Sequence, residues 1–223
     1  MNPEIIATAD GSSTLYVKEL DETYHSRHGA VQESQWVFID RGFIPACATK
    51  KQLSILEIGF GTGLNAWLTF NHCEQHSVAV KYTTLEPLQL PEEVWGQLHF
   101  PLPHPERFSS LHTAPWDEMA DLSGKFSLHK LHALIQNAEF PSSEFDLVYY
   151  DAFGPRVQPA MWEREIFSAL FSAMNEGAIL VTYCAKGQVR RDLCAVGFSV
   201  ERLAGPPGKR EMLRATKTTS PWT

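Results

Sequence analysis

An acidic residue followed by alternating glycines is the part of this sequence best suited to chemistry. Glu57 precedes Gly59, Gly61 and Gly63, and a second acid, Glu86, follows 23 residues after the last glycine. Glycines between a strand and a helix allow positive φ and lack the Cβ atoms that would keep a ligand away. The helix behind the turn offers free N–H groups. The pattern indicates a ligand held against bare backbone.

The spacing of this turn argues against a dinucleotide. The dinucleotide fingerprint G-x-G-x-x-G places its third glycine where this sequence has Leu64. A Glu57 carboxylate aimed into the site would repel a pyrophosphate and favour a cation. S-adenosylmethionine carries a sulfonium and an ammonium but no phosphate, and Glu86 is placed for its ribose hydroxyls. The alternative is that both acids are solvated loop residues.

Asp151 is a third acid, at the end of the apolar run 145–153. An alkylamine that accepts a methyl group is mostly protonated at pH 7. A carboxylate at this place can hold the ammonium, take its proton and orient the nitrogen. Phe153 could stack on a planar base. In the alternative interpretation, Asp151 caps the next turn or touches only the cofactor.

The elements that must position these residues alternate between apolar strands and helices. We predict strands over 53–58, 80–86, 126–133, 145–153 and 178–184, helices over 64–76, 161–174 and 186–197, and a C-terminal hairpin over 198–205 and 209–216. Residues 13–20 and 34–39 read as short β-like runs, and proline-rich 87–126 reads as irregular. Continuous apolar strands that alternate with helices indicate a parallel sheet covered on both faces.

The predicted fold is therefore α/β, with a mostly parallel sheet, a C-terminal antiparallel hairpin and a small N-terminal β extension. This is the Rossmann-like architecture of class I S-adenosylmethionine-dependent methyltransferases. We expect residues 1–50 to form the N-terminal extension, packed on the core, and residues 51–223 to form the methyltransferase domain.

The charge of the chain is uneven. The net charge of −7 argues against a protein that coats nucleic acid non-specifically. Residues 186–217, however, hold eight cations against three acids, a net +5 that leaves −12 for the remainder. This basic end is typical of a surface for a polyanionic partner. The alternative is a solvated, arginine-rich surface.

Several features favour a protein of the cytoplasm without metal or membrane. The four cysteines form no C-x-x-C pair, which disfavours a zinc site or a disulfide framework. The first residues lack the basic and apolar regions of a secretory signal. No apolar run is long enough to span a membrane.

Four ordered motifs resemble one family. They are GFGTGLN (59–65), YYDAFGPRVQPAMW (149–162), VTYCAKGQVRRDL (181–193) and GPPGKREML (205–213). With them, and with ETYHSRHGAVQESQWVF (22–38), the chain resembles the methyltransferase domain of the bifunctional tRNA 5-methylaminomethyl-2-thiouridine enzymes, the MnmC family, and its stand-alone relatives.

The resemblance implies methyl transfer from S-adenosylmethionine to the aminomethyl nitrogen of 5-aminomethyl-(2-thio)uridine at the tRNA wobble position. Asp151 would meet the amine. The FAD-dependent oxidase of the bifunctional members would follow the last motif, where this chain ends, so we expect no FAD. The cofactor would be held by the glycine turn and its neighbours: Glu57, Gly59, Phe60, Gly61, Thr62, Gly63, Asn65, Glu86, Asp151 and Phe153.

Two further cofactor contacts are less direct. Family members tend to carry an acid after the third strand, where the adenine amino group binds, and His132 is the nearest position here. Tyr24, next to His25, would form a lid over the cofactor or simply pack the N-terminal segment.

The resemblance also gives the basic end a partner, the anticodon stem-loop of tRNA. Phosphates would be bound by Lys186, Arg190, Arg191, Lys209 and Arg210. A wobble base turned out of the loop would stack on Phe153 and Trp162. For Trp162 the alternative is core packing.

Two rival functions stay open at this point. Aminopropyltransferases such as spermidine synthase share the sheet and glycine turn, but they use D-x-x-D, and the second acidic position here is Gly154. A non-catalytic module that binds S-adenosylmethionine is the other rival.

Overall fold

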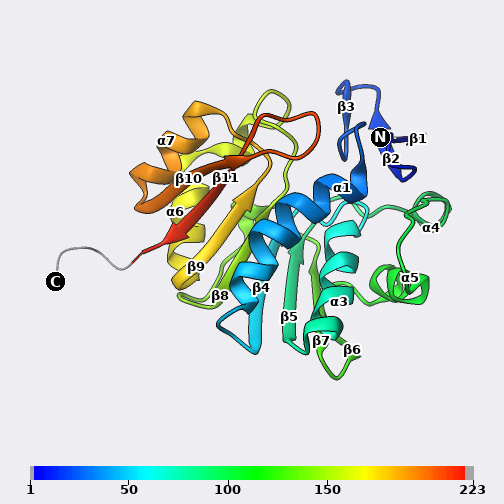
Figure 1. Cartoon of the computed structure of the whole chain (residues 1–223), viewed down its shortest axis with the longest axis horizontal. Helices are drawn as coiled ribbons and strands as arrows, with labels where there is room; N and C mark the ends of the chain where they lie inside the picture. Colours follow the sequence, from blue (N-terminus) through cyan, green and yellow to red (C-terminus); the bar gives the residue numbers. More distant parts are fainter. Residues whose placement is uncertain (1–2, 219–223) are drawn as a thin grey trace.

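An eight-stranded sheet runs through the molecule, and the computed structural model describes residues 3–218 (Figure 1). Its strand order is β10-β11-β9-β8-β4-β5-β7-β6. In that order the strands are β10 (Phe198–Ala204), β11 (Glu211–Lys217), β9 (Met174–Thr182), β8 (Phe145–Tyr150), β4 (Gln52–Ile58), β5 (Ala79–Leu85), β7 (Phe126–Leu131) and β6 (Met119–Ser123). The five central strands pair in parallel, whereas β11 pairs antiparallel with both β9 and β10. The predicted parallel sheet with a C-terminal hairpin is confirmed.

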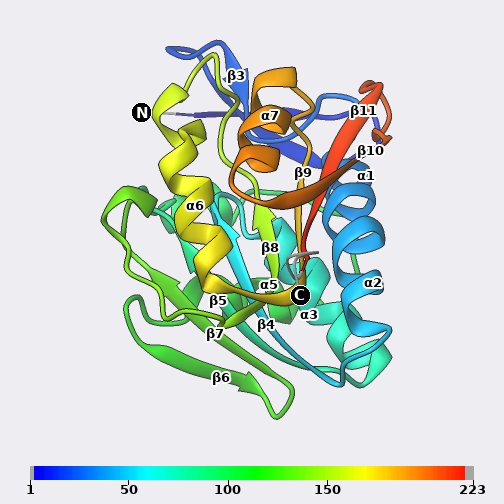
Figure 2. The same cartoon turned by 90° about the vertical axis from the view of Figure 1, so that its left-hand side faces the viewer.

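Helices cover both faces of this sheet (Figure 2). One face carries α1 (Ala30–Ser34), η1 (Gln35–Phe43), α2 (Ile44–Cys47) and α3 (Leu64–His76), and the other carries α6 (Arg164–Ala173) and α7 (Gly187–Ala195). Neighbouring residues of β4 serve opposite faces: Ile55 packs in the cluster under α3, and Leu56 packs in the cluster under α6. Two buried clusters therefore hold the sheet between the helical layers.

The predicted N-terminal β extension is confirmed as a small antiparallel sheet. Its strands are β1 (Glu4–Ala7), β2 (Ser13–Val17) and β3 (Glu22–Thr23). In Figure 1 it lies at the upper end of the molecule, above the large sheet. The main-chain N–H of Ser13 donates to His99 O at 2.7 Å, which ties this sheet to the loop before α5.

The β-like run at 34–39 was predicted wrongly. These residues belong to one continuous helix, formed by α1, η1 and α2, whose middle is π-helical. Val37, Phe38 and Ile39 are buried on the sheet. A short apolar run fits a strand or a buried helix equally well, and packing on the sheet decides for the helix here.

The proline-rich region contains more regular structure than we expected. It holds α4 (Glu92–Trp95) and α5 (Pro105–Thr113), and also the edge strand β6, which pairs antiparallel with β7. The residues of β6 are exposed or only partly buried, so β6 lacks the apolar pattern that predicts a strand. Two short 3-10 turns, η2 (Ile135–Asn137) and η3 (Pro159–Trp162), follow later in the chain.

The division of the chain into two parts at residue 50 stays a prediction. Residues 1–2 and 219–223, at the outer ends of these two parts, lie outside the described residues. Among residues 3–218, no helix combines the length and apolar character needed to cross a membrane. In the same residues, no group of three or more His, Cys, Asp or Glu side chains is arranged to hold a metal ion.

Candidate active site

A crevice opens where β4, β5 and β8 end. Parallel strands present their carboxyl ends at one edge of the sheet, and ligands of open α/β sheets bind at that edge. The glycine turn, the end of β5 and the residues after β8 form its walls, and Tyr24 and Tyr183 contribute from other elements. The acids Glu86 and Asp151 line it, while its described lining residues include no lysine or arginine.

The glycine turn at the bottom of the crevice depends on left-handed backbone. Gly59 has φ 94° and Gly61 has φ 50°, values that side chains other than glycine rarely adopt. A Cβ on Gly59 would lie 3.0 Å from Asp151 O, and one on Gly61 would lie 3.1 Å from the Tyr24 ring. Glycine is therefore required for the tight packing of the turn against β8 and the N-terminal segment.

Glu86 is fixed in the crevice by two backbone donors. Gly61 N–H donates to its Oε2 at 3.0 Å, and Leu88 N–H donates to its Oε1 at 2.8 Å. Burial raises the pKa of this carboxyl. Because each oxygen keeps a further lone pair, the carboxylate can also accept two ligand hydroxyls. This placement agrees with the predicted ribose contact, which stays a prediction.

Asp151 lies opposite, just after β8. Its Oδ2 accepts a hydrogen bond from Asn65 Nδ2 at 2.8 Å. Burial raises the pKa of Asp151 from 3.8 to about 8. A carboxyl with such a pKa exchanges its proton readily near neutral pH, as a general acid or base requires.

Glu57 does not line the crevice, contrary to our expectation. It is fully buried in β4, and its Oε2 accepts a hydrogen bond from Thr84 Oγ1 at 2.8 Å. Burial raises the pKa of this carboxyl well above its ordinary value. Side chains alternate along a strand, so Glu57 points toward α3 while Ile58 lines the crevice.

The remaining residues predicted to hold the cofactor differ in whether they line the crevice. Asn65 is buried and reaches the site only through its bond to Asp151. Gly63 begins α3 with φ 75° and does not line the crevice. Phe60 and Thr62 do line it, and Phe60 packs edge-on against His112 with ring centres 5.4 Å apart.

The N-terminal segment closes over the glycine turn. Tyr24 lines the crevice and meets the Phe153 ring edge-on at 5.1 Å. The buried His25 hydrogen-bonds through Nε2 with Thr62 Oγ1 at 2.7 Å. Burial lowers the pKa of His25 to about 4, so its ring is neutral at pH 7. The segment both packs on the core and forms a wall of the site.

Two predicted ligand contacts lie elsewhere. Trp162 is only 6% exposed, packs on Tyr150 and donates its indole N–H to Phe153 O at 2.8 Å. It therefore supports the Phe153 loop from behind and offers no face for stacking. His132 is exposed and hydrogen-bonds with Pro87 O at 3.0 Å, while the residues after it line the crevice.

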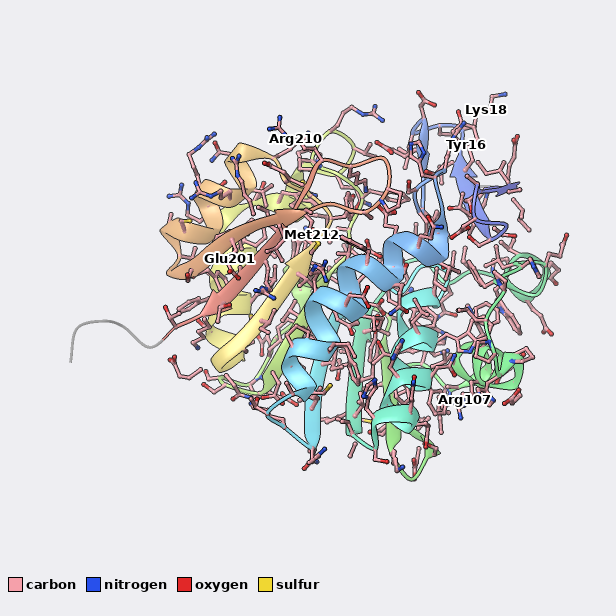
Figure 3. All side chains as sticks on the ribbon, in the orientation of Figure 1. Tyr16, Lys18, Arg107, Glu201, Arg210 and Met212 are labelled. Carbon is pink, nitrogen blue, oxygen red and sulfur yellow. The ribbon has the colours of Figure 1, made fainter. Side chains whose placement is uncertain are left out.

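The predicted phosphate ligands fall into two groups. Lys186, Arg191 and Arg210 are exposed, Arg190 is half-buried, and none of them pairs with a carboxylate within the described residues. Figure 3 shows Arg210 at the upper end of the molecule. The acids nearest to them in sequence, Asp192 and Glu211, are paired with Arg164 and Arg202. These four cations keep their charge available.

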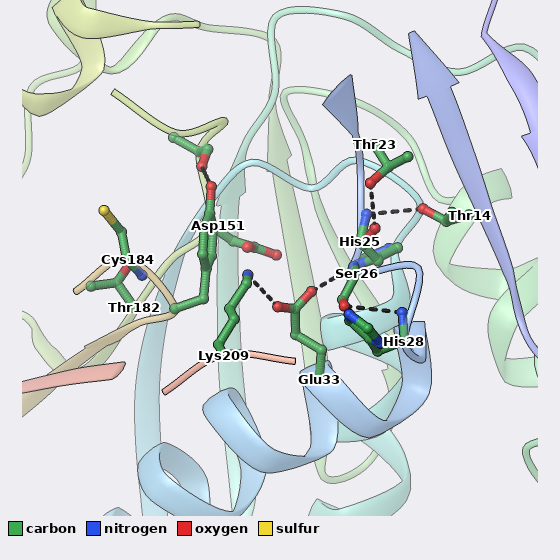
Figure 4. A network of polar contacts seen from close by, with 12 residues as sticks. Thr14, Thr23, His25, Ser26, His28, Glu33, Asp151, Thr182, Cys184 and Lys209 are labelled. Carbon is green, nitrogen blue, oxygen red and sulfur yellow. Dashed lines mark hydrogen bonds and ion pairs between the residues drawn. The ribbon is translucent and has the colours of Figure 1, made fainter. Parts of the chain in front are cut away.

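Lys209 is the exception among the predicted phosphate ligands. It donates to Glu33, and its Nζ lies 3.8 Å from the centre of the Tyr183 ring (Figure 4). It therefore packs behind Tyr183, a residue of the crevice wall, and does not belong to the open basic surface.

Sequence reasoning missed Glu33 and Tyr183. Tyr183 directly follows β9, lines the crevice and donates its hydroxyl to Ala152 O at 2.8 Å. Its place directly after a buried strand, at the edge of the sheet where ligands bind, could have predicted that Tyr183 lines the crevice. Glu33 lies in a stretch that read only as polar, and no local pattern marks it.

Comparisons with known proteins give a consistent result. A profile described as S-adenosyl-L-methionine-dependent methyltransferase matches residues 112–218. The tRNA 5-methylaminomethyl-2-thiouridine biosynthesis bifunctional protein MnmC of Cupriavidus necator is 30% identical over 225 residues, an alignment that covers 96% of this chain and 34% of that protein. The chain thus spans about a third of the length of the curated relatives it matches.

Solved structures extend the comparison to the fold. The crystal structure of MnmC2 from Aquifex aeolicus has a TM-score of 0.83 and 29% identity, and covers all of this chain and 73% of its own. Spermidine synthase from Thermotoga maritima has a TM-score of 0.57 and 15% identity, and covers 95% of this chain and 70% of its own. The second likeness concerns the fold alone.

Proposed function

Because this chain belongs to the S-adenosyl-L-methionine-dependent methyltransferases, we propose that it methylates the aminomethyl nitrogen of 5-aminomethyl-(2-thio)uridine at the wobble position of tRNA. The names of its MnmC relatives, which refer to tRNA 5-methylaminomethyl-2-thiouridine biosynthesis, support this substrate. A reaction on tRNA would take place in the cytoplasm. The observation that carries the proposal is a crevice with two carboxylates and no described cationic lining residue.

The residues of the crevice fit the methyl donor. When bound, S-adenosylmethionine supplies a methyl group on a positively charged sulfur, and the amine nitrogen receives it. Gly59 and Gly61 leave room for close approach, since a Cβ on either would fill the turn. Glu86 would hold two hydroxyls of the ribose. An acidic crevice suits a cation and would repel a pyrophosphate.

Asp151 would prepare the acceptor. As a carboxylate it holds an incoming alkylammonium, whose own pKa is about 10.4 in water and falls on burial. The pKa of Asp151 is about 8, which brings the proton affinities of donor and acceptor close together. Proton transfer to Asp151 leaves a lone pair on the nitrogen, and the Asn65 hydrogen bond keeps the carboxyl in place.

The exposed cations would dock the tRNA. Lys186, Arg190, Arg191 and Arg210 lie on α7, at its start and on the β10–β11 loop, outside the crevice. Phosphate contacts of this kind position a nucleic acid without reading its sequence. Phe153, on the crevice wall, would stack on the wobble base.

The test is mass spectrometry of the wobble nucleoside. tRNA that carries 5-aminomethyl-2-thiouridine is incubated with the purified protein and S-adenosylmethionine, and the nucleoside should gain one methyl group. The Asp151→Asn variant serves as a matched control that should methylate the tRNA about 10²-fold more slowly. Consumption of decarboxylated S-adenosylmethionine and putrescine would favour an aminopropyltransferase instead. Cofactor binding without any reaction would favour a non-catalytic module.

A further inference from the structure

An ion pair between the buried Glu33 and the half-buried Lys209 lies beside Asp151 and has no role in the reaction as described so far. Lys209 Nζ donates to Glu33 Oε1 and sits over the Tyr183 ring. That ring lines the same crevice as Asp151, and Figure 4 shows the Asp151 carboxylate on the side of the network where Lys209 and Glu33 meet. One positive and one negative charge thus lie behind the Tyr183 ring, close to the reactive carboxyl.

Both members of the pair are held in place. Glu33 is 7% exposed, and its Oε2 accepts a hydrogen bond from Ser26 N–H at 2.7 Å. Lys209 follows Gly208, whose backbone packs so tightly on the His28 ring that a Cβ would overlap it. The pair is therefore held in one position behind the crevice wall, unlike the exposed ion pairs elsewhere on the surface.

Within residues 3–218, few ionisable groups interact with the charge of Asp151, and the cation among them is Lys209. Lys209 favours the ionised form of the carboxyl, and Glu33 disfavours it. Tyrosines are neutral at pH 7, and the pKa of the buried Glu57 carboxyl is raised by burial. The groups that feel the charge of Asp151 are Glu33 of α1, Glu57 of β4, Tyr82 of β5, Tyr183 after β9 and Lys209 of the β10–β11 loop.

Resting on the proposed function, we propose that Glu33 and Lys209 are positioning residues that set the proton affinity of Asp151. The step they serve conserves charge. An N–H bond of the substrate ammonium breaks, its electron pair stays on nitrogen, and the proton forms an O–H bond on Asp151. The products are a neutral amine and a neutral carboxyl. Too high a proton affinity would leave Asp151 protonated before substrate arrives, and too low an affinity would leave the ammonium intact.

The two charges act in opposite directions, which gives the proposal a signed test. The full chain is prepared without cofactor and with ¹³Cγ-labelled aspartate, and the Asp151 signal is identified by its loss in Asp151→Asn. In Lys209→Gln the remaining Glu33 charge should raise the titration midpoint of Asp151 by about one pH unit. In Glu33→Gln the remaining Lys209 charge should lower it by a similar amount.

Matched variants separate charge from packing. Lys209→Arg keeps the charge and should titrate like the parent. The double variant Glu33→Gln with Lys209→Gln removes both charges, so its midpoint should return close to that of the parent. Lys81→Gln breaks an ion pair with Glu144 at the other end of the sheet and should leave Asp151 unchanged.

The acid limb of the pH dependence of kcat/KM should move with these midpoints. At pH 6 we expect Lys209→Gln to be about tenfold less active than the parent, because a one-unit shift lowers the ionised fraction tenfold. Either single variant is enough to test the proposal if it folds, because the midpoint should rise in one variant and fall in the other. An unmoved midpoint in either one would overturn it. Shifted midpoints in a protein that does not methylate the tRNA would overturn only the proposed function.

Discussion

The crevice and the basic surface carry opposite charges and expose them to water to different degrees. In the crevice, Asp151 and Glu86 are held by fixed N–H donors, and burial raises the pKa of both. On the basic surface, Lys186 and Arg191 are exposed. Buried charges interact strongly and are screened little, whereas exposed charges interact weakly through water and are screened by salt beyond about 8–10 Å. We therefore propose proton chemistry for the first region and docking for the second.

Removal of the reactive acid should have the largest effect. We expect Asp151→Asn to slow methyl transfer by about 10²-fold or more, the usual effect of a positioned base. The affinity for S-adenosylmethionine should stay within about tenfold, since Glu86 and the glycine turn remain. Single-turnover kinetics and calorimetry measure the two effects. Equal turnover in variant and parent would remove Asp151 from the mechanism.

Removal of the second crevice acid should affect binding more than chemistry. Glu86→Ala deletes a carboxylate that both orders the turn and faces the ligand, so the Kd for S-adenosylmethionine should rise about 10- to 100-fold, the range for a charged hydrogen bond. Glu86→Gln, which keeps one acceptor oxygen, should lose less affinity for S-adenosylmethionine than Glu86→Ala. Calorimetry with the cofactor decides, and unchanged affinity in both variants would place the ligand elsewhere.

Charge reversal on the basic surface should spare the crevice. We expect Arg190→Glu with Arg191→Glu to weaken tRNA binding about tenfold or more at low salt and to reduce its salt dependence. Cofactor affinity should not change. Lys125→Glu, on the turn between β6 and β7, is a control that should leave tRNA binding nearly intact. If the control weakens binding as much as the double variant, docking is not localised on α7.

The smallest effect concerns stability. Below pH 3.8 Asp151 is protonated in both the folded and unfolded chain. Between pH 3.8 and about 8 the unfolded chain releases this proton while the folded chain keeps it, so the free energy of unfolding falls as the pH rises. Above about pH 8 the loss is complete. Asp151→Asn should therefore raise Tm at pH 8–9, and each 1 kcal/mol gained should appear as roughly 2–4 °C in a chain of this size.

Thermal unfolding of the two proteins across the pH range checks this expectation. The gain of the variant should shrink toward zero near pH 4. A gain that is the same at every pH would mean that the effect comes from packing and not from the charge.

The main elements were predictable because their signals are local. A buried apolar run that ends at the glycine turn defines β4. The acid that follows the next apolar run, Glu86, was therefore predictable as a residue of the crevice. The run at 34–39 was mispredicted because only its packing on the sheet distinguishes helix from strand. Likewise, strand alternation turns Glu57 into the core, although its position beside the glycines suggested the crevice.

The ion pair behind the crevice wall could not be predicted from local sequence patterns. Glu33 and Lys209 are 176 positions apart, and their pairing depends on how the first helix and the last hairpin meet. Charge counting therefore placed Lys209 on the docking surface. Trp162 shows the same limit, since a tryptophan next to a loop looks identical in sequence whether it stacks on a ligand or supports the loop.

The place of β11 between β9 and β10 has a consequence for biosynthesis. The ribosome makes β10 first, yet its only neighbour in the sheet is β11. We expect β10 to stay unpaired until the last hairpin has left the exit tunnel. The ion pair between Glu33 and Lys209 should also form only at that stage. A released chain that ends before residue 211 should be cut by protease within 198–204, and protection there would show that this edge assembles without β11.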